Sequence, residues 1–221
     1  TKAGSGDING AEEQIQNSLR LANKDLYYRA GAEIKIAQAN ALLSSPEAKS
    51  SQAQFSAIAQ DINTRALGAV QADPTNYLNH LSLARAYASL FPILSDTERV
   101  KAHDLAVQSY AAAQKLNPAS PAIALEQARM EAGLGNITEA KKWIADALNK
   151  KGNYTEAIFL LAQIQASEGN LDDAISSAEV ASVVAPNDIG VFFELGLLKY
   201  KNGDYNGAIA ALEHAVILNP Y

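Results

Sequence analysis

Apolar and small residues recur at helical spacing along the chain, and in its second half the whole pattern repeats at a fixed interval. Gly169 and Gly203 stand at equivalent places of two successive copies, and Pro186 and Pro220 stand at the ends of those copies. A repeat period of about 34 residues, with glycine in the middle and proline at the end, is typical of stacked helix pairs. We therefore predict an all-α fold, a right-handed α-solenoid of antiparallel helix pairs with about eleven helices.

The first half of the chain follows the same plan less regularly. Its opening segment has a turn at Gly6 and Asp7 and a single apolar helical face, so it matches only the second helix of a pair and lacks its partner. Further along, Ser95 or Asp96 is placed to cap a helix that follows a long turn. The predicted array comprises a half repeat at 1–23, an irregular long repeat at 25–75, a repeat with an extended turn at 76–118, and regular repeats at 121–154, 155–188 and 189–221.

Small side chains occupy the positions where paired helices must approach each other. One lies midway along each first helix, another opens each second helix, and a third lies further along the second helix. Small residues at such contacts let helix axes approach to about 8–10 Å. Glycines end three first helices, where a left-handed backbone is favoured. In this order, the positions are Ala84, Ala128, Ala162 and Gly196; Ala106, Ala140, Ala174 and Ala208; Ala113, Ala147, Ala181 and Ala215; and Gly135, Gly169 and Gly203.

Composition narrows the classes of function without changing the fold prediction. The net charge of −6 disfavours nucleic acid and anionic membrane surfaces as partners, because both require clustered lysine and arginine. The absence of cysteine excludes disulfides and thiolate metal sites. The chain has no run of about 18 apolar residues, so we predict no membrane insertion. The first residues contain neither Met nor an apolar signal segment, which indicates a soluble piece of a longer protein, cytoplasmic or extracytoplasmic.

The last repeat has a sequence signature of its own. It places an aromatic residue, a Leu-Gly pair, a Gly-Asp-Tyr turn, two alanines and a proline at Phe192, Leu195, Gly196, Gly203, Asp204, Tyr205, Ala208, Ala215 and Pro220. This segment resembles the tetratricopeptide repeat, and the resemblance is closest over 121–221, extends to 76–118 and fades over 1–75. Gly152 and Gln127 depart from it, since the family has proline and leucine there. The resemblance implies a tetratricopeptide-like superhelix.

The resemblance also implies a binding surface. In this family the first helices line the concave face, which is the usual place for a partner. An apolar stripe flanked by two arginines suits an amphipathic helix or an extended segment with an acidic or amide-bearing edge. The family's clamp for a terminal carboxylate is not implied, because leucine, phenylalanine and glutamine hold most of its places. The implied partner-binding residues are Leu81, Arg85, Leu125, Arg129, Phe159, Gln163, Phe193 and Leu197.

No group of residues in the sequence has the spacing of a catalytic site. His80, His103 and His214 occupy different places in the repeat, and none has a second histidine at the spacing of a helical metal site. Gly133 and Gly135 follow a helix rather than a strand, so they do not form a phosphate-binding loop. We therefore predict no enzyme activity, no metal and no cofactor.

Three hypotheses for function follow. The leading one is a non-enzymatic scaffold that binds a peptide or partner helix in the concave groove. A diffuse resemblance to the repeat regions of bacterial cell-surface polysaccharide ligases and polymerases suggests a soluble appendage of a larger bacterial membrane enzyme or complex. The third is a structural spacer that assembles end to end. Self-association is expected because the first helix lacks its mate and the last repeat leaves apolar residues uncovered, namely Ile209, Leu212, Val216 and Leu218.

Overall fold

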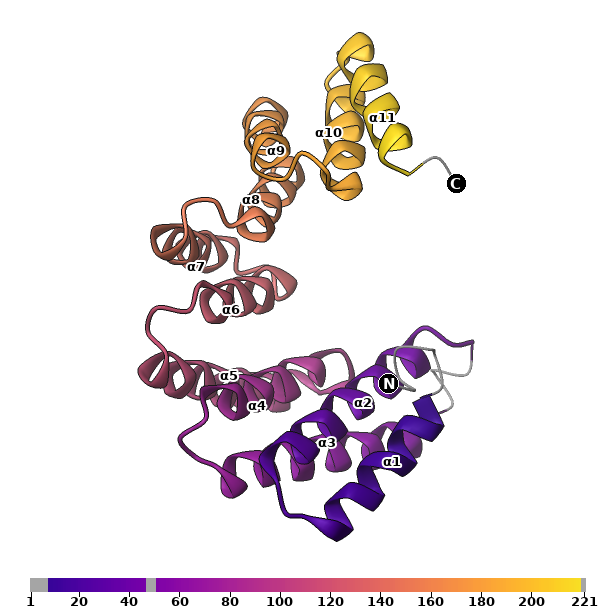
Figure 1. Cartoon of the computed structure of the whole chain (residues 1–221), viewed down its shortest axis with the longest axis vertical. Helices are drawn as coiled ribbons and strands as arrows, with labels where there is room; N and C mark the ends of the chain where they lie inside the picture. Colours follow the sequence, from indigo (N-terminus) through magenta and orange to yellow (C-terminus); the bar gives the residue numbers. More distant parts are fainter. Residues whose placement is uncertain (1–7, 47–50, 220–221) are drawn as a thin grey trace. The chain divides into compact units, whose positions relative to one another are not determined.

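The structure, a computed structural model, describes residues 8–46 and 51–219, nearly all of which are helical (Figure 1). This part of the chain contains eleven α-helices, one short 3-10 helix and no strand, which confirms the all-α prediction and the predicted number of helices. The turn at Gly6 and Asp7 and the closing Pro220 lie outside the described residues. The helices are α1 (Ile8–Leu21), α2 (Asp25–Leu43), α3 (Gln52–Ala72), α4 (Tyr77–Ser89), η3 (Phe91–Ile93), α5 (Asp96–Leu116), α6 (Pro121–Gly133), α7 (Ile137–Lys150), α8 (Thr155–Ser167), α9 (Leu171–Val184), α10 (Ile189–Lys201) and α11 (Tyr205–Leu218).

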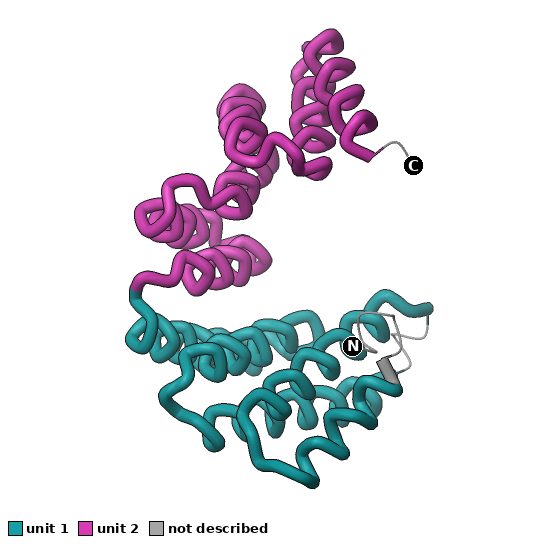
Figure 2. The backbone as a smooth tube through the Cα atoms, in the orientation of Figure 1, with its two compact units in different colours: residues 1–118 teal, residues 119–221 magenta. Residues whose placement is uncertain are grey.

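The chain divides into two compact units, Thr1–Pro118 and Ala119–Tyr221 (Figure 2). Unit 1 contains α1 to α5, and unit 2 contains α6 to α11. In unit 2 the pairs are α6 with α7, α8 with α9, and α10 with α11, and each pair packs on the next through α7 against α8 and α9 against α10. Unit 2 therefore has the stacked helix pairs that the repeat period predicts.

Small side chains fill the contacts between paired helices, as predicted. Every alanine assigned to these contacts is buried, and most have no exposed surface. At Gly196, which is also buried, an added Cβ atom would lie 2.7 Å from the Cγ atom of Leu212 on α11. The close approach of α10 to α11 therefore leaves no room for a larger residue at this position.

The turns inside the pairs of unit 2 each contain a left-handed glycine. Gly135, Gly169 and Gly203 have φ angles of 78°, 83° and 84°. A residue with a Cβ atom adopts this conformation at a cost of about 1–2 kcal/mol. These glycines therefore end α6, α8 and α10, as the sequence predicts.

At the first of these turns, replacement of two nearby glycines by alanine is expected to change the free energy of unfolding in opposite directions. We expect Gly135→Ala to lower the free energy of unfolding by about 1 kcal/mol, because its φ is positive. We expect Gly133→Ala to raise it by about 0.5–1 kcal/mol, because Gly133 is helical and an added Cβ would meet no atom within 4 Å. Urea denaturation followed by circular dichroism measures both. A loss of stability in both variants would contradict this account.

In unit 1, the opening helix α1 packs on α2. The predicted apolar face of α1 faces inward, since Ala11 is buried and Ile15 and Leu19 are partly buried. Its exposed residues are polar, such as Gln16 and Asn17, apart from Leu21 at its end. The outward face of α1 is therefore mainly hydrophilic, and it does not support the predicted self-association through an uncovered first helix.

Of the two residues predicted to cap the helix after the long turn, Ser95 is the cap. The backbone N–H of Glu98 donates to Ser95 Oγ at 3.5 Å, and the backbone N–H of Ser95 donates to Glu98 Oε2 at 3.0 Å. This reciprocal pair is a capping box, which satisfies two N–H groups at the start of α5. Asp96 is the first residue of the helix itself.

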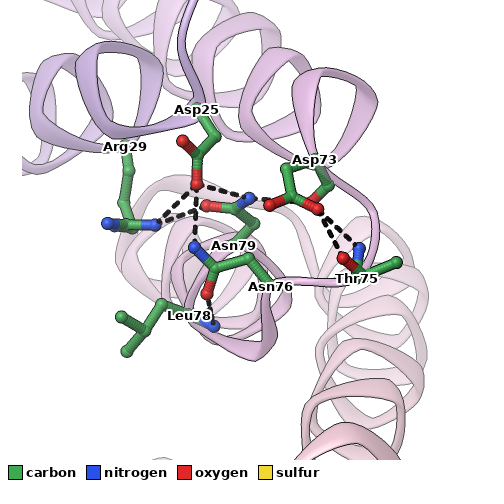
Figure 3. A network of polar contacts seen from close by, with 7 residues as sticks. All are labelled: Asp25, Arg29, Asp73, Thr75, Asn76, Leu78 and Asn79. Atoms are coloured by element: carbon green, nitrogen blue, oxygen red, sulfur yellow. Dashed lines mark hydrogen bonds and ion pairs between the residues drawn. The ribbon is translucent and has the colours of Figure 1, made fainter.

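A polar network joins the start of α2 to the start of α4 (Figure 3). Asn79 on α4 has no exposed surface, and its Nδ2 donates to Asp25 Oδ2 at 3.0 Å and to the carbonyl oxygen of Asp73 at 2.8 Å. Its Oδ1 accepts a hydrogen bond from Arg29 Nη1 at 2.6 Å. Asn76 adds a donor to Asp25 Oδ2 at 2.8 Å. The network fixes α2 against the turn that begins α4.

The same network sets the ionisation of Asp25. Burial raises the pKa of this carboxyl, but the hydrogen bonds from Asn79, Asn76 and the backbone N–H of Leu26, together with the charge of Arg29, outweigh burial and lower the pKa below its ordinary value of 3.8. Asp25 is therefore a stabilised anion in the folded chain.

Candidate functional site

A pocket of about 430 Å³ opens in unit 2. Its lining includes two basic residues, Arg129 of α6 and Lys151, which follows α7. It also includes two apolar residues, Phe159 in α8 and Val191 at the start of α10. Three successive helix pairs thus contribute to one hollow, because equivalent helix ends stack beside each other in a helical repeat.

Two cations lie at this pocket. Arg129 and Lys151 are both exposed, and neither forms an ion pair with a carboxylate of the described residues. The Nζ atom of Lys151 lies 5.0 Å from the centre of the Tyr154 ring, an arrangement that holds the ammonium by its attraction to the ring face. The two side chains therefore keep their charge available to a ligand.

The carboxylates at the pocket are not equivalent. Asp188 caps the start of α10, because its Oδ1 accepts hydrogen bonds from the backbone N–H groups of Gly190 at 2.9 Å and Val191 at 3.3 Å. Glu156 is exposed in the first turn of α8. Burial raises the pKa of the neighbouring Tyr154 hydroxyl, and the charge of Glu156 raises it further. The phenol is protonated at neutral pH, as it would be at its ordinary pKa of 10.0, and it can donate a hydrogen bond.

The apolar part of the pocket is anchored to the core. Phe159 is partly buried and packs against the cluster of Ile158, Ala181 and Val191. An aromatic ring fixed on one side offers the other side to a ligand at little entropic cost. The pocket thus combines two cations with a rigid apolar surface.

Several of the predicted partner-binding residues are exposed. Arg129 and Phe159 lie together at the pocket. Gln163 and Phe193 are exposed on α8 and α10, and Leu197 is partly exposed on α10. The exposed fraction of Phe193 is 51%, which is high for a phenylalanine. These positions stay candidates for partner contact.

Three predicted residues do not offer a free side chain. Leu81 and Leu125 are only 4% and 3% exposed, so they belong to the core of their units and not to an accessible surface. Leu125 packs in a cluster with Ala157 of α8, which covers it. Arg85 Nη1 lies 3.4 Å from Glu33 Oε1 and so is held in an ion pair.

Lys151 and Tyr154 are absent from the sequence-based prediction, because they lie in the connection between two pairs. The family pattern has a proline near this point, and Gly152 replaces it here. The replacement of that proline by Gly152, next to Lys151, is the one feature of the sequence that could have indicated that this turn differs from the others. The predicted site residues come from the helices alone.

Histidine contacts in the described chain are structural. His80 Nε2 lies 2.8 Å from the carbonyl oxygen of Pro74, and the His214 ring contacts the Phe192 ring in a tilted arrangement, with ring centres 4.1 Å apart. Among the described residues, no group of three His, Cys, Asp or Glu side chains could hold a metal ion. None of the described helices has the length and apolar character needed to cross a membrane.

The comparison with protein families matches one segment of the chain. Residues 189–221 match the model of the tetratricopeptide repeat. No curated protein matches the chain. The match covers the last helix pair, where the sequence signature is also clearest.

Solved structures extend this likeness to most of the chain. TTC0263, a thermophilic tetratricopeptide protein of Thermus thermophilus, has a TM-score of 0.66 at 18% identity, over 94% of this chain and 93% of its own. MamA from Desulfovibrio magneticus RS-1 has a TM-score of 0.57 at 13% identity, over 86% and 95% of the two chains. YrrB, a tetratricopeptide protein with an unusual peptide-binding site, has a TM-score of 0.51 at 16% identity, over 95% and 94%. The chain therefore has the tetratricopeptide-repeat fold.

Proposed function

We propose that the chain is a non-enzymatic protein-interaction scaffold, and that unit 2 binds a peptide or a partner helix at the pocket of Arg129, Lys151 and Phe159. Stacked helix pairs present an extended surface to partners, and this fold in YrrB carries a peptide-binding site. The observation that carries the proposal is the presence in one pocket of two exposed cations, which form no ion pair with a described carboxylate, beside a fixed aromatic ring.

The chemistry of the pocket selects the ligand. A carboxylate of the ligand fits between Arg129 and Lys151, because a bound anion gains charge-assisted hydrogen bonds from both. An apolar side chain next to that carboxylate fits against Phe159. Phe193 occupies the place equivalent to Phe159 in the next pair, one repeat period later, and offers a second apolar contact. The proposed ligand is therefore an acidic segment with spaced apolar residues.

A peptide library displayed on phage and selected against the protein tests this proposal. The selected peptides are expected to carry Asp or Glu next to an apolar residue. Calorimetric titration is expected to show at least about tenfold weaker binding of these peptides to Arg129→Glu and to Phe193→Ala, since side chains at the centre of an interface contribute most of the affinity. Both side chains are exposed, so neither substitution removes core packing.

The matched control is Arg20→Glu on α1, an exposed arginine outside the pocket. It makes the same change of charge and is expected to leave peptide binding unchanged. Selection of peptides without an acidic residue, or equal affinity for wild type and Arg129→Glu, would refute the assignment of the pocket.

A further inference from the structure

Glu194 of α10 is a carboxylate close to the pocket of Arg129, Lys151 and Phe159. Its side chain is partly exposed, and it forms no ion pair with a described residue. It follows Gly190 and Val191, which line the pocket, by four and three residues. Side chains at these spacings share one face of a helix. Glu194 therefore lies on the side of α10 that lines the pocket, one helical turn further along.

The repeat period gives the direction of this side chain independently. Leu160, which lies one repeat period before Glu194, is partly buried against a cluster that contains residues of the preceding pair, α6 and α7. The same position of α10 faces its own preceding pair, α8 and α9, by this equivalence. The sequences of α8 and α9 contain no lysine or arginine. Glu194 therefore faces a helix pair that has no cation to neutralise it.

The cations of α10 itself do not serve Glu194. Lys199 is paired with Glu179 of α9, with Nζ and Oε1 2.8 Å apart. Lys201 lies seven residues after Glu194, which corresponds to about 10 Å along a helix. A partly buried carboxylate is solvated less well than one in water, so a nearby cation stabilises its charged form. A basic group of a ligand would supply that cation.

On the α8 side, Gln163 extends the pocket in the same way. It follows Phe159 by four residues, so it lies one turn along α8 from the aromatic ring of the pocket. Gln163 is exposed, and its amide forms no hydrogen bond with a side chain of the described residues. An amide oxygen accepts hydrogen bonds from ammonium and guanidinium groups. Gln163 and Glu194 thus extend the pocket with two hydrogen-bond acceptors, which we call the acceptor subsite.

The net charge of unit 2 favours a basic residue in the ligand. Residues 119–221 contain seven lysine and arginine residues and thirteen aspartate and glutamate residues, so the net charge of −6 belongs to unit 2. A ligand whose charged residues are all acidic is repelled by this charge as it approaches. A basic residue in the ligand reduces the repulsion, while an acidic residue still reaches Arg129 and Lys151.

We propose that the acceptor subsite binds a lysine or arginine of the ligand. This inference rests on the proposed function and extends its ligand. The segment places an acidic residue at Arg129 and Lys151, an apolar residue at Phe159 and a basic residue at the acceptor subsite. Opposite charges at the two ends of the site also select one direction of binding, because the reverse direction would bring like charges together.

Short synthetic peptides test the subsite. Each peptide is blocked at both ends and carries an aspartate, then a leucine, and then a lysine two, three or four residues after the leucine; in the control peptides glutamine replaces the lysine. In calorimetric titration, the best lysine peptide is expected to bind about three- to fivefold more tightly than its glutamine control, as for a partly exposed ion pair. This difference is expected to disappear at about 1 M salt, where the screening length is about 3 Å.

Protein variants separate the acceptor subsite from the pocket. Glu194→Gln is expected to abolish the preference for lysine and to leave the affinity for the glutamine peptides unchanged. Arg129→Glu is expected to weaken both kinds of peptide by about tenfold or more. The matched control Glu213→Gln removes the same charge at an exposed position of α11 outside the pocket, and it is expected to retain the preference.

The subsite and the pocket fail in different ways. Equal binding of lysine and glutamine peptides to wild type, or a preference that persists in Glu194→Gln, would overturn the subsite and leave the proposed function intact. A preference that is lost in Glu156→Gln and kept in Glu194→Gln would place the basic residue in the pocket itself. The absence of binding by every peptide, or equal affinity of wild type and Arg129→Glu, would refute the pocket and the subsite together.

Discussion

Replacement of Arg65 by methionine is expected to destabilise unit 1 by about 3 kcal/mol and to detach α1, because it leaves the largely buried carboxylate of Glu12, whose side chain is 14% exposed, without its main partner. Arg65 on α3 is 8% exposed, and its Nη2 forms an ion pair with Glu12 on α1. Asp61 also lies near Arg65, with its Oδ2 at 3.8 Å from Nη2. Lys35 of α2 reaches both carboxylates, with distances of 3.7 Å to Glu12 and 3.3 Å to Asp61. The cluster therefore connects the first three helices through charge.

Urea denaturation measures the overall loss, and hydrogen exchange of the α1 amides measures the detachment. The double variant Glu12→Leu with Arg65→Met is expected to recover most of the stability, because removal of both charges leaves no unpaired ion and adds apolar contact. Arg20→Met, at an exposed site on α1, controls for the loss of a positive charge. A single variant within about 0.5 kcal/mol of wild type would show that Lys35 alone neutralises Glu12.

The helix pairs of unit 2 were predictable because their contacts are short in sequence and recur with the period. Ala162, for example, packs with Ala174 and Ala178 of the next helix, and Ala162 and Ala174 have the small equivalents Gly196 and Ala208 one repeat period later. When small residues recur at the same position of each repeat, they indicate that the same helix–helix contact is present in each repeat. The fold could therefore be inferred from spacing alone.

The polar contacts that join α1 to α3 and α2 to α4 in unit 1 do not recur, and the sequence did not reveal them. Glu12 meets Arg65 and Asp25 meets Asn79 across more than fifty residues, and neither pair has an equivalent in the repeats. Gly31 illustrates the difficulty, since an added Cβ would clash with the Arg65 guanidinium. The glycine is visible in the sequence, but the side chain that requires it is distant.

The candidate site was predictable only in part, for a related reason. Arg129 and Phe159 follow from the position of a residue within the repeat, and both reach the pocket. Leu125 follows from the same rule but is only 3% exposed, because it packs in a cluster of residues from α6, α7 and α8. Position in the repeat gives the side of a helix, whereas exposure depends on the size of the residues packed next to it.

The second large effect is expected at Asn79, where Asn79→Ala should lower the free energy of unfolding by about 3 kcal/mol. The substitution removes two donors and one acceptor from a fully buried place, and takes a partner each from Asp25, Arg29 and the carbonyl oxygen of Asp73. Each buried polar group left unsatisfied costs about 1–3 kcal/mol, less where Asn76 still serves Asp25. Chemical denaturation measures the effect, and Asn149→Ala at an exposed position of α7 is expected to change stability by less than about 0.5 kcal/mol.

The pH dependence of stability distinguishes this network from simple packing. Because the pKa of Asp25 is lowered in the folded chain, its contribution is fully present above the ordinary value of 3.8 and is lost as pH falls through the folded pKa. Asn79→Ala removes a hydrogen bond that lowers this pKa, so the folded and unfolded values move closer together. The variant is therefore expected to lose less stability than wild type as pH falls below about 3.8. Parallel curves of unfolding free energy against pH for the two proteins would show that Asn79 acts through packing and not through the Asp25 carboxylate.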